Sequence, residues 1–462
     1  MQKTVVIDVV GLTPELIGEH TPHLQKFLNG GKMAAINPAI PAVTTTAQSN
    51  YLTGVHPAEH GIVANGWYFR DECEIKLWRQ SNKLVQHRKI WDEAREINPS
   101  FTVANMFWWY NMYSSADYAV TPRPMYPSDG RKLPDIYSWP SNLRFELQQE
   151  LGAFPLFNFW GPNSSIVSTQ WIAKASMRIT ERFDPTLVLI YLPHLDYGLQ
   201  RHGPDVSKVA HDLREVDQVI GQLMEFYGKR GHQIVILSEY GITAVDTPIH
   251  INRLFRQHNM IAIREELGLE LLDAGMSTAF AVADHQIAHI HIQDMRRKDE
   301  IKAMVEKLPG VAEVLDEDGK RAYHLDHPRA GDLVALAKPN AWFTYYYWLD
   351  DSRAPDFART VDIHRKPGYD PVELFIDPAL KNPKLKAGYK LARKKLGFRY
   401  LMDLTPLDAT LVKGSHGVKT APNQGPLFIT QHADMLHSDM IDSTDVYGLI
   451  MQHLGLKHAE TV

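Results

Sequence analysis

The sequence predicts an α/β protein: a mostly parallel central sheet with helices on both faces, plus a smaller inserted α+β domain. Three observations support this prediction. Short apolar runs rich in β-branched residues recur in the first half of the chain, helix-like stretches separate them, and the composition changes after Thr243. Strands and helices in alternation are typical of a parallel sheet whose two faces are both covered by helices.

Four runs are predicted to be buried strands, because they are apolar at successive positions and therefore on both faces of a strand. They are "TVVIDVV" (4–10), "FTVANMFW" (101–108), "TLVLIYL" (186–192) and "QIVILS" (233–238). Helices are predicted over 168–183 and 205–231. The second of these stretches has apolar residues at helical spacing, ends on Lys-Arg-Gly and leads straight into the strand at 233–238.

Residues 245–405 differ in character from the residues before them. They contain charge-rich loops with Pro and Gly, an aromatic block "WFTYYYW" (342–348) and a predicted strand "QIAHIHI" (286–292). We expect them to form the inserted domain, so that residues 1–244 and 406–462 together make the core. The segment "LVKGSHGV" (411–418) is predicted to return the chain to the main sheet.

The totals describe an ordinary globular protein of 462 residues, with a net charge of −5 and one cysteine. This charge predicts neither a nucleic-acid partner nor a membrane partner, and basic clusters such as "ARKK" (392–395) are expected to be solvated surface. The single Cys73 fits a reducing compartment. The N-terminal residues lack signal-peptide features and the chain lacks an apolar run of about 18 residues, so we expect a cytoplasmic protein.

Four side chains that can bind a metal ion lie near the ends of predicted strands or follow apolar runs. They are Asp8, Asp196, Glu239 and His416. Ligands of open α/β sheets bind beyond the carboxyl ends of the strands, where these side chains would meet. A single strand-end carboxylate is more often a helix cap, but four such groups favour a shared metal site, since buried carboxylates need a partner.

The stretch "AIPAVTTTAQSNYLTG" (39–54) places three threonines at the start of a predicted helix. β-branched residues are poor helix starters, yet a Thr hydroxyl can cap a first turn. A helix N-terminus also suits an anion such as phosphate, and a hydroxyl bound there by a divalent ion has a lowered pKa and can attack phosphorus. The triplet is therefore predicted to supply a cap, a nucleophile or both.

These residues resemble the alkaline phosphatase superfamily, in particular its nucleotide pyrophosphatase/phosphodiesterase branch. The similar motifs are Asp8 near the end of an early strand, Pro41-Ala42-Val43-Thr44, Thr53-Gly54 and "HPAEHGIVANGW" (56–67). The resemblance implies an alkaline-phosphatase-like sheet with a cap domain at 245–405, and it makes Thr44 the nucleophile. For Thr45 and Thr46 we expect a capping or packing role in the first helical turn.

The resemblance also implies two divalent metal ions. One would be held by Asp8, Thr44 and Glu239, and the other by Asp196 and His416. Glu239 and Tyr240 stand where the family has an Asp-His pair, and Gln200 stands where it has a His four residues after the Asp. Carboxylate-rich sites suit Mg²⁺ or Mn²⁺, whereas Zn²⁺ prefers nitrogen and sulfur ligands, so the metal is predicted to be Zn²⁺, Mn²⁺ or Mg²⁺.

Several residues are candidates for the positions left open by these departures. His202 is a candidate metal ligand, with Gln200 or a histidine of the insert as alternatives; the insert candidates are His250, His285 and His364. The family's phosphoryl-binding Asn is Ala47 here, and the candidates to replace it are Gln48, Asn50 and Asn65, of which Asn65 is our candidate catalytic residue.

The segment "DIHRKPGYDP" (362–371) makes His364 and Lys366 candidate substrate-binding residues, with an ordered surface turn as the alternative. Aromatic residues such as Trp67, Trp108 and Trp109 can stack on a base, but at these spacings they are more often core.

The predicted function is metal-dependent hydrolysis of a phosphodiester or pyrophosphate bond through a phospho-threonine intermediate at Thr44. The predicted partner is a small phosphorylated substrate, with no duplex nucleic acid. One alternative is a C–P hydrolase resembling phosphonoacetate hydrolase, which shares this scaffold. The other is a non-catalytic member that binds a phosphorylated metabolite, for which the missing ligands and Ala47 are the support.

Overall fold

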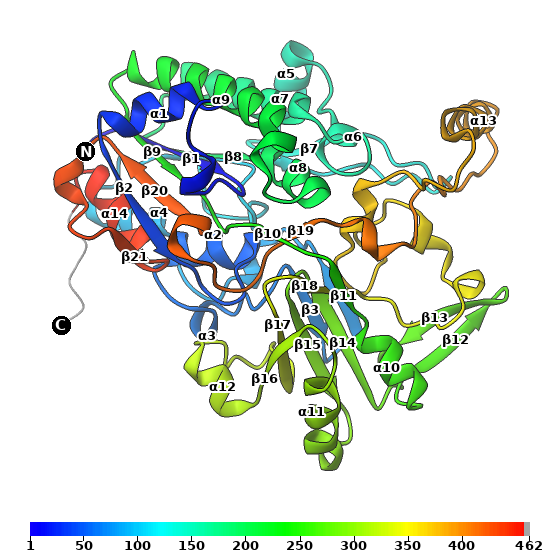
Figure 1. The fold of residues 1–462 in the computed structure, drawn as a ribbon. Coiled ribbons are helices and arrows are strands. Elements are labelled where there is room, and N and C mark those ends of the chain that lie inside the picture. Colours follow the sequence, from blue (N-terminus) through cyan, green and yellow to red (C-terminus); the bar gives the residue numbers. More distant parts are fainter. Residues whose placement is uncertain (457–462) are drawn as a thin grey trace.

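A sheet of nine strands runs through residues 1–456, which are the residues that this computed structural model describes (Figure 1). Its strands, in spatial order, are β21 (Met440–Asp442), β2 (Lys32–Asn37), β20 (Leu427–Thr430), β9 (Gln233–Leu237), β1 (Thr4–Val9), β8 (Leu187–Leu192), β5 (Val103–Met106), β6 (Tyr118–Pro122) and β7 (Ile136–Trp139). Strands β9, β1, β8, β5 and β6 are parallel, whereas β20 and β7 run antiparallel to their neighbours. The four strands predicted from the sequence are four adjacent parallel strands, which confirms the α/β fold class.

The register of the central strands brings their carboxyl ends to one edge of the sheet. Asp8 in β1 lies opposite Tyr191 in β8 and Leu237 in β9. Glu239 follows β9 after one residue, and α8 (His194–His202) begins one residue after β8, so that Asp196 lies in its first turn. The three carboxylates therefore leave the sheet at the same edge.

Helices cover both faces of the sheet, as predicted (Figure 1). On one face lie α1 (Pro22–Asn29), α5 (Leu143–Leu151), α7 (Ile166–Phe183) and α9 (Val206–Gly228), with α6 (Leu156–Phe159) and α8 beside them. On the other face lie α2 (Thr44–Thr53), α4 (Ile90–Ile97) and α14 (Asp445–His453). Helix α9 begins where the Asp205 carboxylate accepts a hydrogen bond from Ser207 N, an N-cap that satisfies a free amide of the first turn.

A second part of the molecule has its own sheet and its own hydrophobic core. Its four-stranded antiparallel sheet has the order β14 (Ala279–Asp284), β15 (Ile287–Ile292), β17 (Leu333–Ala337) and β16 (Val311–Leu315). Around it lie β11 (Thr247–Ile249) paired with β18 (Ala341–Phe343), the hairpin β12 (Ala262–Glu266) and β13 (Leu269–Asp273), and the helices α10 (Ile251–Gln257), α11 (Lys298–Glu306) and α12 (Glu317–Ala322). The aromatic block 342–348 is buried in this core.

Two segments differ from the sequence expectations. The hairpin β3 (Gly66–Phe69) and β4 (Glu74–Leu77) packs on β14, although it lies outside residues 245–405, because Tyr68 joins the second hydrophobic core. The prediction that 411–418 returns to the main sheet is wrong: β19 (Gly414–Ser415) pairs with β10 (Thr243–Ala244) in a separate ribbon, and the chain rejoins the large sheet at β20. The short helix α3 (Pro57–His60) follows α2, and α13 (Pro383–Lys395) projects from the body.

Candidate functional site

A cavity of about 740 Å³ opens at the carboxyl edge of the large sheet, between that sheet and the inserted residues. Polar side chains lie at its inner end: Thr44, Asp196, Gln200, Tyr240, His285 and Tyr369. Aromatic and apolar side chains make up much of the remaining wall, among them Trp78, Trp109, Trp160, Leu391 and Leu401. A concave, largely apolar cavity with a few convergent polar groups is typical of a small-molecule site.

Thr44 is the first residue of α2, and its side chain is buried at the inner end of the cavity with 3% exposure. Its hydroxyl lies 3.4 Å from the Tyr240 hydroxyl. The other two threonines of the triplet face away from the cavity, since Thr45 Oγ1 donates to Ala64 O and Thr46 Oγ1 donates to Ile62 O. They pack α2 against the loop behind it, and no threonine of the triplet caps the helix with its side chain.

Asp8 and Glu239 form a buried carboxyl pair that a glutamine amide bridges. Gln48 Nε2 donates to Asp8 Oδ2 at 3.2 Å and to Glu239 Oε1 at 2.6 Å, while Gln48 Oε1 accepts from Trp109 N. Burial, and then the charge of Glu239, raises the pKa of Asp8, and burial raises the pKa of Glu239. The Thr44 hydroxyl also interacts with Glu239.

Asp196 accepts hydrogen bonds on both carboxylate oxygens from neutral donors. Gln200 Nε2 lies 2.7 Å from Oδ2, and the Tyr240 hydroxyl lies 3.1 Å from Oδ1. Gln200 is held in turn by the Tyr369 hydroxyl, which donates to its Oε1 at 2.8 Å. Burial raises the pKa of Asp196 to about 7, with the Gln200 and Tyr240 hydrogen bonds acting against that rise.

Four aromatic rings are stacked along one side of the site. Tyr240 lies on His416 with a centroid distance of 3.5 Å, His416 lies 3.8 Å from His285, and His285 lies 3.6 Å from Tyr369. His416 Nδ1 is 2.8 Å from Ala42 O, which fixes the ring, and its buried Nε2 has no hydrogen-bond partner among the described residues. His285 Nδ1 is 2.6 Å from Asp284 Oδ1. Burial lowers the pKa of both imidazoles, so both rings are neutral near pH 7.

The carboxyl pair has donor atoms that fit one divalent cation. Asp8 Oδ1 and Glu239 Oε2 are buried and have no hydrogen-bond partner among the described residues. With the Thr44 hydroxyl they offer an oxygen-only set, which suits Mg²⁺ or Mn²⁺ better than Zn²⁺. Moreover, no described Lys or Arg contributes to the pKa shift of Asp8 or Glu239. A bound cation would therefore neutralise negative charge that is otherwise buried without a counter-ion.

The residues around Asp196 differ from the ligand set that the resemblance implies for the second ion. Each carboxylate oxygen of Asp196 accepts one hydrogen bond, from Gln200 or from Tyr240, and keeps a lone pair that a cation could use. The buried Nε2 of His416, the other predicted ligand, has no hydrogen-bond partner among the described residues. The number of ions therefore stays a prediction.

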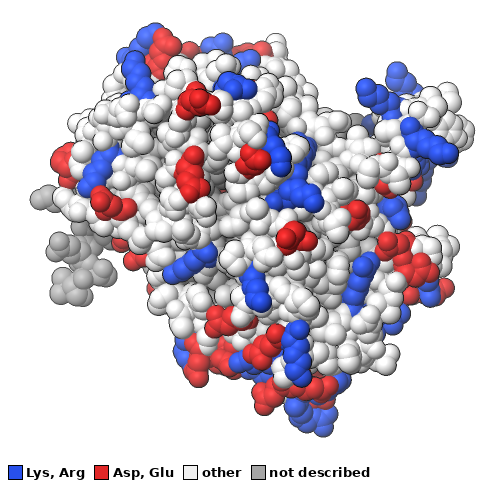
Figure 2. Space-filling model, viewed as in Figure 1, with Lys and Arg blue, Asp and Glu red and all other residues white. Residues whose placement is uncertain are grey.

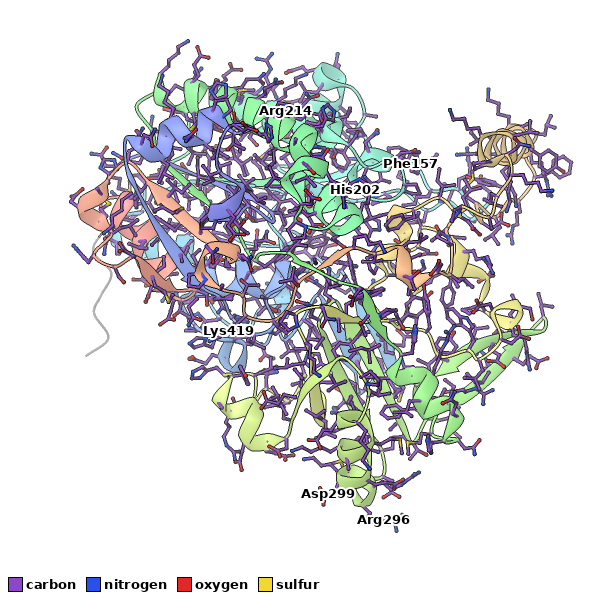
Figure 3. The ribbon with its side chains drawn as sticks, in the orientation of Figure 1. Phe157, His202, Arg214, Arg296, Asp299 and Lys419 are labelled. Atoms are coloured by element: carbon purple, nitrogen blue, oxygen red, sulfur yellow. The ribbon has the colours of Figure 1, made fainter. Side chains whose placement is uncertain are left out.

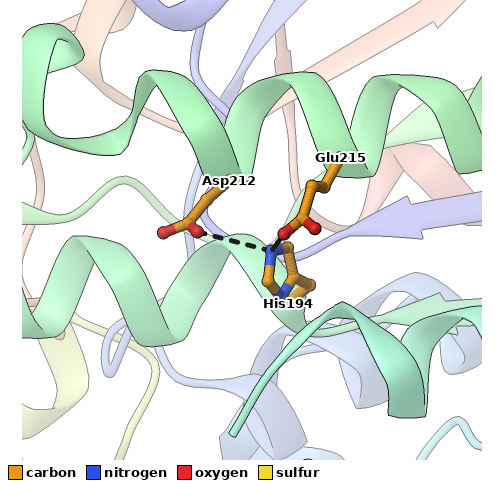
Figure 4. A group of neighbouring side chains, drawn as sticks. All are labelled: His194, Asp212 and Glu215. Atoms are coloured by element: carbon orange, nitrogen blue, oxygen red, sulfur yellow. Dashed lines mark ion pairs between the residues drawn. The ribbon is translucent and has the colours of Figure 1, made fainter.

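A different group of side chains, away from the cavity, can also hold a metal ion. His194, Asp212 and Glu215 bring ligand atoms within 4.8 Å of one another, where α8 crosses α9 (Figure 4). His194 Nε2 is 3.2 Å from Glu215 Oε2 and 3.6 Å from Asp212 Oδ1. Histidine beside two carboxylates is also a common ion pair, and these residues lie outside the cavity lining.

The structure brings some predicted site residues together and places others elsewhere. Asp8, Thr44, Asp196, Glu239 and His416 lie close together, and Thr44 and Asp196 of these line the cavity. Asn65 lies behind Thr44, where its Oδ1 accepts from Thr45 N and its Nδ2 donates to Asp284. Of the insert histidines, His285 reaches the site, His364 lines the outer cavity and His250 pairs with Thr344 elsewhere.

His202 and Lys366 do not reach the cavity. His202 is exposed at the last turn of α8 (Figure 3), because the helix rotation that points Gln200 at Asp196 points His202 outward. Lys366 is buried in ion pairs with Asp370 at 2.7 Å and Glu373 at 2.8 Å, which makes it a structural residue outside the cavity lining. Asn50 bonds Ser443 and His60 and also stays away from the cavity.

Three contacts within the site are not predicted from the sequence, although Gln48 is itself a candidate for the phosphoryl-binding position. Gln48 bridges the carboxyl pair, Tyr369 holds Gln200, and Asp284 holds His285. The adjacent Asp284 and His285 at the end of a predicted strand are a signal that could have indicated a polar site there. Tyr369 lies in the segment singled out as 362–371, but the contact itself depends on the fold.

Comparison with known proteins adds a family match to this geometry. A family model described as type I phosphodiesterase / nucleotide pyrophosphatase matches residues 4–370. A pyrophosphatase/phosphodiesterase of Schizosaccharomyces pombe is 26% identical over 262 residues, covering 54% of this chain and 44% of that protein. Ectonucleotide pyrophosphatase/phosphodiesterase 1 of Saccharomyces cerevisiae is 24% identical over 281 residues, covering 54% of this chain and 35% of that protein. The aligned part is thus under half the length of either relative.

Two kinds of solved structure share the fold. Murine ectonucleotide pyrophosphatase/phosphodiesterase 5, as an inactive variant in complex with AMP, superposes with a TM-score of 0.60 at 14% identity, covering 99% of this chain and 96% of that one. Phosphonoacetate hydrolase of Sinorhizobium meliloti 1021, in complex with phosphonoacetate, superposes with a TM-score of 0.62 at 14% identity, covering 98% and 96%. At these identities the likeness concerns the fold.

Proposed function

This chain belongs to the type I phosphodiesterase/nucleotide pyrophosphatase family, and from that premise we propose that it hydrolyses a phosphodiester or pyrophosphate bond in a small phosphorylated compound. The observation that carries the proposal is the position of Thr44. Its hydroxyl lies at the N-terminus of α2, at the inner end of the cavity, beside Glu239 and Tyr240. A helix N-terminus favours the anionic phosphoryl group that this hydroxyl would attack.

In the proposed reaction, the Thr44 oxygen forms a bond to phosphorus as the bond from phosphorus to the leaving oxygen breaks. Glu239 is placed to take the Thr44 proton, because it interacts with that hydroxyl. The Tyr240 hydroxyl, 3.4 Å from Thr44 Oγ1, is placed to donate to a phosphoryl oxygen. Water then hydrolyses the phospho-threonine and restores the hydroxyl.

The proposal includes one divalent cation, Mg²⁺ or Mn²⁺, held by Asp8, Glu239 and Thr44. When bound, such an ion lowers the pKa of the hydroxyl and neutralises charge on the phosphoryl oxygens. Members of the family are metal-dependent, and the unpartnered oxygens of Asp8 and Glu239 support this position. A cytoplasmic location remains part of the proposal, and its support is the single cysteine.

Replacing Thr44 tests the proposed function. Thr44→Ala is expected to lower kcat for bis(p-nitrophenyl) phosphate in the presence of Mn²⁺ by about three orders of magnitude or more, because the nucleophile is lost. The matched control is Thr46→Val, which removes the hydroxyl two residues along the same helix, where it bonds Ile62 O. Full activity in Thr44→Ala would show that this hydroxyl is not the nucleophile.

Product analysis separates the two alternatives. Release of phosphate together with a carbon acid from phosphonoacetate would make the chain a C–P hydrolase, which the shared fold of phosphonoacetate hydrolase allows. Tight binding of phosphorylated compounds without turnover of any of them would make it a binding protein. The observation that favours a binding protein is that both carboxylate oxygens of Asp196 accept hydrogen bonds.

A further inference from the structure

Helix α13 carries an apolar stripe that faces solvent. The helix has no buried residue and projects from the body of the molecule (Figure 1). The stripe repeats at helical spacing, i, i+4, i+7 and i+11, and consists of Leu385, Tyr389, Ala392 and Leu396, all exposed. The exposed fractions of its large side chains are 73% for Leu385, 63% for Tyr389 and 74% for Leu396. An apolar helix face turned to water marks an interaction surface.

The charge around this stripe is strongly positive. Residues 381–399 contain no Asp or Glu, and their basic residues are Lys381, Lys384, Lys386, Lys390, Arg393, Lys394, Lys395 and Arg399. Only Lys386 and Lys390 of these pair with an acid in the described chain, namely Asp403. Figure 2 shows the basic side chains of α13 around a white surface. By the 100° rotation per residue, Lys384 and Lys395 flank the stripe on one side and Arg393 on the other.

The opposite side of α13 is part of the cavity. Ala387, Leu391 and Lys394 line it, and the segment after the helix adds Tyr400, Leu401, Met402 and Leu404. Phe157, which is exposed on α6, lines the same cavity (Figure 3). The cavity therefore runs from Thr44, past aromatic side chains, to the projecting helix, and apolar groups line it at its outer end.

An anionic membrane surface fits α13 better than a protein partner does. The helix is 13 residues long, about 20 Å, so its exposed side offers a few hundred Å² at most, which is below the roughly 800 Å² that each partner contributes to a standard protein interface. A basic helix with an apolar stripe lies in the plane of a lipid surface, where each Lys or Arg adds attraction to anionic headgroups. No described helix is long and apolar enough to cross the bilayer, so the contact is peripheral.

We propose that α13 seats the protein on an anionic membrane surface and that the cavity behind it receives the phosphoester of an amphiphile, with the apolar chain along the outer cavity and the phosphoryl group at Thr44. The membrane contact stands on α13 alone, whereas the substrate class rests on the proposed function. The net charge of −5 for the whole chain conceals this local positive surface.

The membrane contact is tested by co-sedimentation of the full chain with vesicles of phosphatidylcholine, alone or mixed with phosphatidylglycerol. We expect binding to the mixed vesicles that weakens as salt is raised. Two variants address the surface. Leu385→Ser/Tyr389→Ser/Leu396→Ser removes the apolar stripe. Lys384→Glu/Arg393→Glu/Lys395→Glu reverses the charge of the residues that flank it. Each is expected to lower the vesicle partition coefficient about tenfold or more. The side chains of the stripe are exposed, so the fold should be retained, which circular dichroism checks.

Leu267→Ser/Met276→Ser is the matched control, since these apolar side chains are 103% and 74% exposed but lie outside α13. It should bind vesicles like the native chain. Failure to sediment with anionic vesicles, or binding that the α13 variants leave unchanged, overturns the proposal. A concentration-dependent dimer in sedimentation velocity that the stripe variant abolishes also overturns it, in favour of a second copy.

The substrate class is tested with two p-nitrophenyl phosphodiesters that differ only in chain length. Hexadecyl p-nitrophenyl phosphate in mixed vesicles is expected to give a kcat/KM about tenfold or more above that of methyl p-nitrophenyl phosphate, and the stripe variant should lose this advantage. Equal values for both esters reject the amphiphile. Absence of turnover of both esters rejects the proposed function instead, and the vesicle-binding result then stands by itself.

Discussion

Replacing both Gln200 and Tyr240 by histidine is expected to raise the number of Mn²⁺ ions bound per chain from one to two. In the native chain these residues donate to Asp196 at 2.7 Å and 3.1 Å. An ion that displaced both donors would give up two hydrogen bonds to a charged group, each about 1.5–3 kcal/mol, or roughly 3–6 kcal/mol together. That corresponds to about two to four orders of magnitude in affinity.

The assay is titration of metal-stripped protein with Mn²⁺, followed by electron paramagnetic resonance of the free ion and by elemental analysis after dialysis. Tyr240→Phe is the matched control: the ring stays on His416 but offers neither a donor nor a ligand, so the count should remain one. Glu239→Gln removes a carboxylate of the native position and should weaken the first ion about a hundredfold or more. Two ions in the native chain, one of them lost in Asp196→Asn, would refute the reasoning.

Two further predictions concern stability. Lys366→Met leaves Asp370 and Glu373 buried without their cation, so we expect a loss of about 3–5 kcal/mol in the free energy of unfolding, measured by urea denaturation, with a larger loss than in the exposed-pair control Lys229→Met. An unchanged midpoint would contradict the structural role of that ion pair. Burial lowers the pKa of Lys89 from 10.5 to about 7. Above pH 10.5 the amine is neutral in both the folded and the unfolded chain, and the free energy of unfolding has its full value. As the pH falls toward 7, the unfolded chain takes up the proton first, so the free energy of unfolding falls. Lys89→Met should remove this dependence and raise Tm at pH 7, and a Tm that stays the same or falls would show that the buried amine costs no stability.

The strands and helix α2 are predictable from the sequence because local patterns encode them. β1, β8 and β9 are apolar on both faces, and their carboxyl ends meet because parallel strands share a direction. This places Asp8, Asp196 and Glu239 at one edge, as predicted. Thr44 is distinguished from Thr45 and Thr46 by its register in the motif 41–44, and the structure turns only Thr44 toward the cavity.

The hydrogen-bond partners of the carboxylates are not predictable in this way, because they are side chains that are distant in sequence. Gln48 meets Glu239 across 191 positions, and Tyr369 meets Gln200 across 169. Both glutamines are candidates in the sequence, Gln48 for the phosphoryl-binding position and Gln200 for a metal-ligand position, but the sequence does not show that Gln48 bridges a carboxyl pair or that Gln200 donates to Asp196.

Composition also misses the features of α13. The cluster "ARKK" is exposed, as expected, but averaging over 462 residues hides that these cations lie on a projecting helix beside an apolar stripe. Which side of that helix lines the cavity and which side faces water depends on how residues 396–405 return the chain to the body.

The sequence alone determined the α/β sheet, the edge at which its ligands gather and the threonine that lies there, since each follows from periodicity within a few residues or from a short motif. Only the tertiary structure decided which oxygens remain available to a cation, which histidine of the insert reaches the site, and which side of α13 faces solvent. These depend on contacts between segments far apart in the chain, and the physical reason is that hydrogen bonding and burial act over a few ångströms in space, irrespective of separation along the sequence.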